Sequence, residues 1–164
     1  MSTSRSAKPS SQELEEQAGL SGKKSKGMSA EDEELHEILL INSPIGIYIV
    51  QNGRFKFVNP KLQEHTGFSD EELLGRESLS LVFPEDGEMV RQNAILMLKR
   101  KTSLPYEYRI INKKGRIVWI METVTPITYK EQPATLGSFM DITRQKASKE
   151  ALRKSEERFR TILE

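Results

Sequence analysis

The sequence contains no cysteine. That absence excludes disulfide bonds, thiolate metal sites, cysteine nucleophiles and flavin chemistry that proceeds through a cysteinyl adduct. An excess of charge of one sign is also lacking, because 25 lysine and arginine residues are balanced by 24 aspartate and glutamate residues in a chain of 164. Without surplus positive charge, we do not expect the protein to bind nucleic acid.

Long hydrophobic runs are missing too. The longest apolar stretches, Ile38–Ile41 and Ile45–Val50, are far shorter than the ~20 residues that span a bilayer. The N-terminus has no apolar signal-peptide core. We therefore expect a cytoplasmic protein without a membrane span.

Motifs of catalysis are absent as well. The sequence has no nucleophile elbow, no phosphate-binding glycine loop and no cluster of metal ligands. We expect the chain by itself to be catalytically silent.

Composition divides the chain into three parts. Residues 1–30 hold too little apolar surface to offset the entropy of ordering, which predicts a disordered leader. Residues 31–143 are long enough for one domain with its own core. Residues 144–164 predict a charged helix with a sparse apolar stripe of Leu152, Phe159 and Ile162, which is compatible either with a coiled coil or with a solvated linker.

The domain begins with a predicted helix and a hairpin. Glu31–Ile41 has helical periodicity and an acidic first turn. Ile45–Gln51 and Phe55–Val58 are predicted strands joined by Asn52-Gly53, the dipeptide that best tolerates a two-residue hairpin turn.

Three helices are predicted to follow. Asn59-Pro60 has the pattern of an N-cap and first helical residue, and opens a short helix through His65. Ser69 and Glu72 have capping-box spacing for a one-turn helix that Gly75 ends. A longer helix starts at Pro84-Glu85-Asp86 and runs to about Lys101, with Met89, Ile95, Leu96 and Leu98 as its expected inward residues.

The remainder predicts three strands, Leu104–Asn112, Arg116–Tyr129 and Ala134–Ile142, joined through Lys113-Lys114-Gly115 and through residues 130–133. The fold class is therefore α+β, with a five-stranded antiparallel sheet and short helices inserted between its second and third strands.

Local motifs accompany this order of elements. They are Asn59-Pro60, Thr66-Gly67-Phe68-Ser69, Glu71-Glu72-Leu73-Leu74-Gly75, Pro84-Glu85-Asp86, Tyr106-Glu107-Tyr108-Arg109, Lys114-Gly115 and Trp119. Together they resemble a PAS domain, with a flanking helix before it and a signalling helix after it. Asp141-Ile142-Thr143 is similar to the tripeptide that ends PAS domains and couples them to an output helix. Phe83 departs from the family, in which histidine is common there, and we interpret it as a packing variation.

The resemblance also bears on cofactors. LOV flavin photosensors, a branch of this fold, carry a reactive cysteine where Gly75-Arg76-Glu77-Ser78 places a serine, so no adduct is expected. Haem-binding relatives usually supply a histidine ligand from the long helix, and Asp86–Lys101 contains none, while His65 lies on an earlier helix. We predict no particular cofactor, and a haem-based gas or redox sensor is left as an alternative.

Alternation in the last three strands separates two apolar faces. By the resemblance, one face points toward the helices and could line a ligand pocket, although a filled core is an open alternative. Its candidates are Tyr106, Tyr108, Ile110, Val118, Ile120, Glu122 and Phe139. The opposite face, with Ile111, Ile117, Trp119, Met121, Leu136 and Met140, needs a cover. We expect that cover to be a second subunit in a homodimer, with Ile117, Trp119, Met121 and Met140 as candidates, or else the leading helix.

The resemblance implies a sensory module of a larger signalling protein. A ligand or stimulus would change packing behind the sheet, and Asp141, Ile142 and Thr143 would pass the change to the following helix. The output domain would lie outside this chain and is most often a histidine kinase of a two-component phosphorelay, sometimes a diguanylate cyclase. A ligand-free module for dimerisation or protein interaction is the alternative.

An internal similarity points the same way. The positions of Leu35, Ile38 and Leu39 in the leading helix match Phe159, Ile162 and Leu163 near the C-terminus. Such a repeat predicts that a second PAS domain begins there, as in a multi-PAS bacterial protein.

Overall fold

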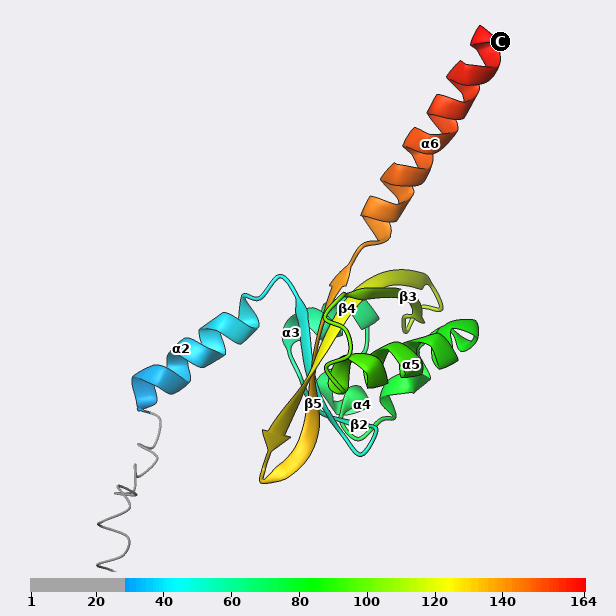
Figure 1. Ribbon diagram of the computed structural model, residues 1–164. Helices are drawn as coiled ribbons and strands as arrows, with labels where there is room; N and C mark the ends of the chain where they lie inside the picture. The colour runs from blue at the N-terminus through cyan, green and yellow to red at the C-terminus, as the bar shows by residue number, and fades with distance from the viewer. Residues whose placement is uncertain (1–28) are drawn as a thin grey trace, which may run out of the picture. The chain divides into compact units, whose positions relative to one another are not determined.

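The computed structural model describes residues 29–164, and the predicted leader, residues 1–30, lies almost entirely outside the described residues. The described chain forms helices at both ends of a mixed α and β region (Figure 1). In chain order the elements are α2 (Ala30–Ile41), β1 (Gly46–Gln51), β2 (Arg54–Val58), α3 (Pro60–Thr66), α4 (Asp70–Leu73), the 3-10 helices η1 (Ser78–Leu81) and η2 (Pro84–Asp86), α5 (Gly87–Leu98), β3 (Tyr106–Ile111), β4 (Ile117–Tyr129), β5 (Gln132–Asp141) and α6 (Thr143–Leu163).

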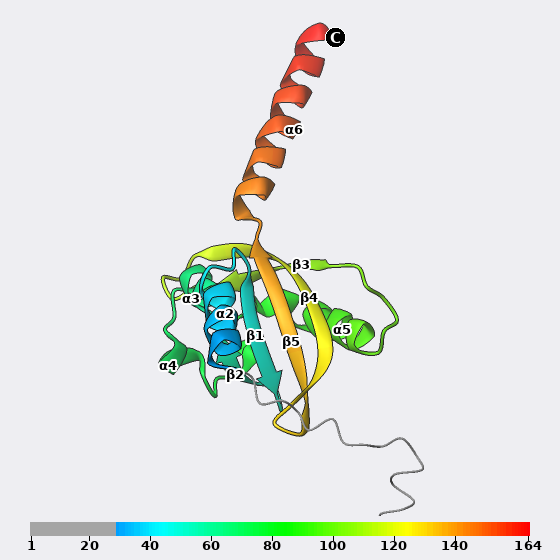
Figure 2. The same ribbon diagram turned by 90° about the vertical axis from the view of Figure 1, so that its left-hand side faces the viewer.

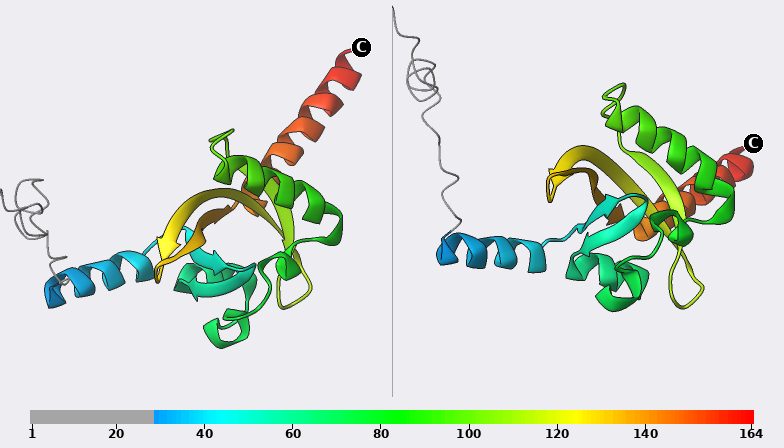
Figure 3. Two further views of the ribbon diagram at one scale, coloured as in Figure 1. Left: turned by 60° about the horizontal axis from the view of Figure 1, so that its bottom comes forward. Right: turned by 90° about the horizontal axis from the view of Figure 1, so that it is seen from below.

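The five strands form one antiparallel sheet in the order β2-β1-β5-β4-β3. Figure 2 views this sheet from one face, with β1, β5 and β4 in front of α5. Figure 3 shows that β4 and the start of β5 curve strongly. The α+β class and the insertion of the helices between β2 and β3 are thus confirmed.

The β1–β2 hairpin forms as its turn residues predict. Asn52 and Gly53 both have positive φ angles, 53° and 75°, which a tight turn between twisted strands requires. The turn between β4 and β5 is tighter than we expected. Lys130 and Glu131 also adopt positive φ, at 49° and 61°, so Gln132 and Pro133 already pair with β4 rather than belonging to the connection.

The short helices α3 and α4 each begin at a residue whose side chain caps the helix. Asn59 is the N-cap of α3, and Ser69 with Glu72 forms the complete capping box of α4, as predicted. Asn59 is fully buried, and its side chain also accepts the Ile47 N–H and donates to the carbonyls of Leu40 and Ile45. This one amide therefore joins α3 to strand β1.

Our prediction for the inward face of α5 was right for Leu98, which is half-buried against the core, but wrong for the other three residues. Met89, Ile95 and Leu96 are exposed, whereas Val90 and Met97 are buried. The spacing of Val90, Ala94 and Met97 also satisfies a helical stripe, and it is this stripe that packs against the core. The helix also ends earlier than predicted, at Leu98, because Arg100 takes a left-handed conformation with φ 56°.

Asp86 fastens the start of α5 to β3. Its carboxylate accepts the Arg109 backbone N–H at 2.9 Å and two guanidinium hydrogen bonds at 2.9 and 2.6 Å, which lower the pKa of Asp86. The Arg109 guanidinium also lies 4.2 Å from the centre of the Phe83 ring. Phe83 thus packs beneath this ion pair.

The core lies between the sheet and the inserted helices. Most of its members come from the inner face of the sheet, and the rest come from α3, α4, η1 and α5. They are Tyr48, Phe55, Val58, Leu62, Leu73, Leu81, Val90, Met97, Tyr106, Tyr108, Ile110, Val118, Ile120, Val124 and Phe139.

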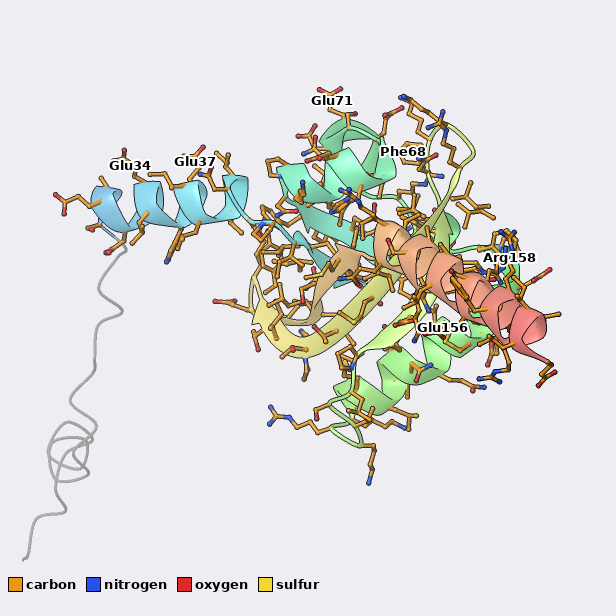
Figure 4. All side chains as sticks on the ribbon, turned by 90° about the horizontal axis from the view of Figure 1, so that it is seen from above. Glu34, Glu37, Phe68, Glu71, Glu156 and Arg158 are labelled. Carbon is orange, nitrogen blue, oxygen red and sulfur yellow. The ribbon has the colours of Figure 1, made fainter. Side chains whose placement is uncertain are left out.

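The helices α2 and α6 contribute no residue to the buried core. The chain divides into two compact units between Leu35 and His36, inside α2, and the second holds the whole sheet. No residue of α2 or α6 is buried, and side chains such as Glu156 and Arg158 project around α6 (Figure 4). Within residues 29–164, no helix is both long and apolar enough to cross a membrane.

Replacing Asn59 with alanine should lower the free energy of unfolding by ~3 kcal/mol, because it removes a helix cap and leaves buried backbone groups unpaired. Ser69→Ala is the matched control, since it removes an exposed N-cap and should cost about 1 kcal/mol. Urea unfolding of both variants measures the difference. Equal losses would show that Asn59 acts only as a cap.

Candidate functional site

A buried glutamate lies at the centre of the inner sheet face. Glu122, on β4, is 3% exposed and is paired in register with Tyr106 on β3 and with Phe139 on β5. Three phenol hydroxyls donate to its carboxylate: Tyr48 to Oε1 at 2.5 Å, Tyr108 to Oε1 at 3.0 Å and Tyr106 to Oε2 at 2.5 Å. The two contacts at 2.5 Å have the length of charge-assisted hydrogen bonds, and the third, from Tyr108, has an ordinary length.

Tyr48 reaches Glu122 across an intervening strand. It lies on β1, which is separated from β4 by β5, and its register partner on β5 is Gly137. A Cβ atom on Gly137 would lie less than 3.0 Å from three atoms of the Tyr48 side chain. The absence of a side chain at Gly137 is therefore what lets the phenol pass over β5.

Burial dominates the electrostatics of this cluster. It raises the pKa of Glu122, and the three phenol hydrogen bonds oppose that rise only in part. Burial, and then the neighbouring Glu122 carboxylate, raise the pKa of Tyr48, Tyr106 and Tyr108 well above the usual value. The phenols therefore remain protonated donors.

A cavity of about 210 Å³ adjoins the Glu122 cluster. The sheet supplies the aromatic side of its wall, and η1 and α5 supply most of the remainder. Its lining residues are Tyr48, Val50, Phe55, Thr66, Ser78, Leu79, Leu81, Val82, Val90, Arg91, Ala94, Ile95, Leu98, Tyr106, Tyr108, Ile110, Glu122, Val124, Thr135 and Phe139.

The predicted pocket residues divide into two groups. Val118 and Ile120 are buried but do not line the cavity. Those that line it are Tyr106, Tyr108, Ile110, Glu122 and Phe139. Tyr48 and Phe55 line it too, and our sequence reasoning missed them because it applied alternation only to the last three strands. The residues Ile47–Val50 are all apolar, so the sequence of β1 does not mark which face is buried, and only the structure places Tyr48 on the inner face.

The structure locates Ser78 and His65, the two residues that bear on flavin and haem binding. Ser78, where the flavin photosensors carry cysteine, lines the cavity. His65 lies on α3 outside the cavity lining, with its ring centre 5.9 Å from that of Phe139. Its Nδ1 is 3.7 Å from Asp141 Oδ2, and burial lowers its pKa despite that carboxylate.

The exit tripeptide clamps the start of α6 onto β4. The Ile142 N–H donates to the Trp119 carbonyl and the Trp119 N–H donates to Thr143 Oγ1, both at 2.9 Å. Asp141 Oδ1 accepts the Thr143 N–H at 2.8 Å, and Ile142 is buried. All three residues of the tripeptide thus hold the strand-to-helix junction.

A side-chain contact strengthens this junction. Lys146 on α6 forms an ion pair with Glu107 on β3, and its ammonium group lies 4.7 Å from the centre of the Trp119 ring. The Arg109 guanidinium lies 5.7 Å from the same ring. Trp119, one of the candidates for a dimer face, is therefore already partly engaged within the chain.

The outer sheet face is apolar and partly exposed. Ile117, Leu136 and Met140 are exposed, and Met140 is paired in register with half-buried Met121. Half-buried Ile111 is paired with Ile117 on the same face. The candidates for a dimer face thus lie on one side of the sheet, and their partner is still a prediction.

Comparison with known proteins agrees with this geometry. A family model described as PAS fold matches residues 55–138, about half of the chain, from within β2 to within β5. The chain belongs to the PAS-fold family.

Individual relatives are more distant. Sporulation kinase A of Bacillus subtilis (strain 168) is 26% identical over 130 residues, a match that covers 79% of this chain but only 22% of that kinase. Among solved structures, the PAS domain of a protein from Colwellia psychrerythraea has a TM-score of 0.62 at 23% identity, covering 68% of this chain and 98% of that one. A sensory box histidine kinase/response regulator from Burkholderia thailandensis E264 has a TM-score of 0.60 at 22% identity, covering 77% and 98%.

The raised pKa of Glu122 makes stability depend on pH. Its folded-state pKa lies above the unfolded value of about 4.3, so its contribution is fully present below that pH and is lost as the pH rises through the folded pKa. Relative to Glu122→Gln, the wild type should therefore lose unfolding free energy between acidic and alkaline pH.

Urea unfolding of both proteins across this pH range measures the difference, and groups common to both cancel. Glu71→Gln, which changes an exposed carboxylate on α4, should follow the wild type at every pH. A wild-type advantage that grows with rising pH would contradict the assignment.

Proposed function

We propose that this PAS domain is a sensory module in which the occupancy or packing of the cavity is relayed through Asp141-Ile142-Thr143 to α6. One observation carries the proposal. Phe139 lines the cavity and lies on β5 only two residues before Asp141, where that strand passes into the clamped junction. A change in the packing of Phe139 therefore acts on the same short segment that holds the start of α6.

His65 offers a second contact along this route. Its ring packs beside Phe139, and its Nδ1 faces the Asp141 carboxylate. A shift of Phe139 would alter both contacts. Relay requires that the ligand favour one of two arrangements of the junction, and the junction has few hydrogen bonds to rearrange.

The output of the signal lies outside this chain in our proposal. The chain spans about a fifth of the length of sporulation kinase A. By analogy with that longer relative, a catalytic domain of the parent protein would lie outside this chain. We propose a cytoplasmic histidine kinase of a phosphorelay as the parent, with a further PAS repeat after α6, and no catalytic role for the chain itself.

Replacing Thr143 with the isosteric valine tests the clamp. The variant lacks the hydroxyl that accepts the Trp119 N–H, so hydrogen exchange at the Trp119 amide should become about fivefold faster or more. Hydrogen exchange resolved by NMR provides the measurement. Thr161→Val, which removes a hydroxyl near the exposed end of α6, should leave this amide unchanged.

The same amide reports on sensing. Mass spectrometry of the denatured protein shows whether a small molecule co-purifies with the chain from cells. Removing that molecule and adding it back should change hydrogen exchange at the Trp119 amide and over residues 142–146 in the wild type. In Thr143→Val this change should shrink. An occupied cavity whose emptying leaves these amides unaltered would refute the relay.

A ligand-free dimerisation module is the second candidate, and the outer sheet face favours it. Large exposed apolar surfaces usually mark interaction sites, and Ile117, Leu136 and Met140 are all exposed there. We propose that a second copy of the chain covers this face. Dimerisation and sensing are compatible, because they use opposite faces of the sheet.

Met140→Glu tests the dimer without disturbing the contacts of Trp119 with α6. A buried unpaired carboxylate would oppose association, so sedimentation velocity should shift from dimer to monomer. Leu74→Glu changes a similarly exposed apolar residue after α4 and should leave the sedimentation unchanged. Dimers that persist in Met140→Glu would exclude this face as the interface.

A further inference from the structure

Glu122 has no cationic partner within residues 29–164, the part of the chain that the structure describes. All its hydrogen bonds come from neutral phenols on β1 and β3. Among the described residues, Arg91 on α5 is the one basic residue that lines the cavity, and it is exposed and forms no ion pair with Glu122. A buried carboxylate without a countercharge is costly to ionise, and a cation brought to it would relieve that cost.

The described residues do not use every acceptor position of the Glu122 carboxylate. A carboxylate offers about four lone-pair sites, and the phenols occupy two on Oε1 and one on Oε2. Of its two oxygens, Oε2 therefore accepts fewer hydrogen bonds from the described residues. Because Glu122 belongs to the cavity wall, a hydrogen-bond donor inside the cavity is the natural partner for this oxygen.

Aromatic rings stand on both sides of Glu122 in the sheet. Tyr106 and Tyr108 stack on β3 with ring centres 5.9 Å apart. On the other side, Tyr48 and Phe55 meet edge to face at 5.5 Å, and Tyr48 lies 6.3 Å from Phe139. Aromatic faces attract organic cations, and all five rings line the cavity.

Size and polarity restrict the rest of the ligand. The cavity, about 210 Å³, is below the ~300–1,000 Å³ typical of pockets for drug-sized molecules. Away from Glu122 its lining is mainly aliphatic, with Leu79, Val90, Ala94 and Leu98 from η1 and α5. A small molecule with one polar end and an apolar body fits these walls.

We propose that the cavity binds a small organic amine, whose ammonium group donates to Glu122 Oε2 while its apolar body lies among the aromatic rings and α5. This inference rests on the proposed sensory function and names the class of ligand. Binding would favour the ionised carboxylate, so amine affinity should fall as the pH drops through the pKa of Glu122. Burial keeps the three tyrosines that line the cavity protonated at acidic and neutral pH, and Arg91 is the other charged residue of the lining.

Calorimetric titration of the 164-residue chain at neutral pH compares two probes that share one ring. Benzylamine is protonated there, and benzyl alcohol is neutral. Benzylamine should bind about tenfold more tightly than the alcohol, and Glu122→Gln should abolish that preference while retaining binding of the alcohol. Glu71→Gln, with its exposed carboxylate, should retain the preference.

Circular dichroism verifies that each variant is folded. If Glu122→Gln does not fold, the wild type and Tyr106→Phe test the amine site instead. Tyr106→Phe keeps the Glu122 carboxylate and removes one hydrogen bond to its Oε2, so this variant should keep the preference for the amine. Equal affinities, tighter binding of the alcohol, or no binding of benzylamine would each overturn the amine site.

The outcome separates this inference from the proposed function. A neutral or anionic molecule that co-purifies and alters exchange at Trp119 would support sensing and refute the amine site. Benzylamine that binds through Glu122 without altering that exchange would support the amine site and refute the relay.

Discussion

A carboxyl group almost fully buried in the middle of a β-sheet must find hydrogen-bond donors inside the protein, because it is withdrawn from bulk water. Glu122 meets this constraint with donors from two other strands, Tyr48 from β1 and Tyr106 and Tyr108 from β3. The bond from β1 crosses β5 and depends on the missing side chain of Gly137. The polar cluster therefore ties the register of β1, β5, β4 and β3 to one another, and the same side chains form the aromatic wall of the cavity.

The junction between β5 and α6 is held by a different kind of interaction. At the junction between β5 and α6, a few exposed or half-buried polar contacts replace dense packing: Thr143 with the Trp119 backbone, Asp141 with the Thr143 N–H, and Lys146 with Glu107. Individual contacts of this kind contribute little to stability, which makes such a junction easier to rearrange than the core. Beyond the junction α6 buries no residue, and its exposed Leu152, Phe159 and Ile162 are available for a partner.

Local patterns predicted much of this fold. Asn52-Gly53 set the first hairpin, Asn59 capped α3, and Ser69 with Glu72 formed the capping box, because each depends on residues close in sequence. The inward face of α5 was largely mispredicted, since Met89, Ile95 and Leu96 are as hydrophobic as the residues that are buried instead. Hydrophobicity alone does not set the phase of a short helix with apolar residues on several sides; its docking onto β3 through Asp86 and Arg109 does.

The sequence by itself determined the order of the elements, the alternation that placed Tyr106, Tyr108, Glu122 and Phe139 on one face, and the lack of any thiol chemistry. Only the tertiary structure decided that Tyr48 joins them, because that contact spans 74 positions in the chain and passes over Gly137 on a strand contributed from elsewhere. It also decided that no cation from residues 29–164 pairs with Glu122. Burial, and the absence of a countercharge among these residues, are properties of the assembled sheet and helices. Together they make Glu122 the polar end of the cavity.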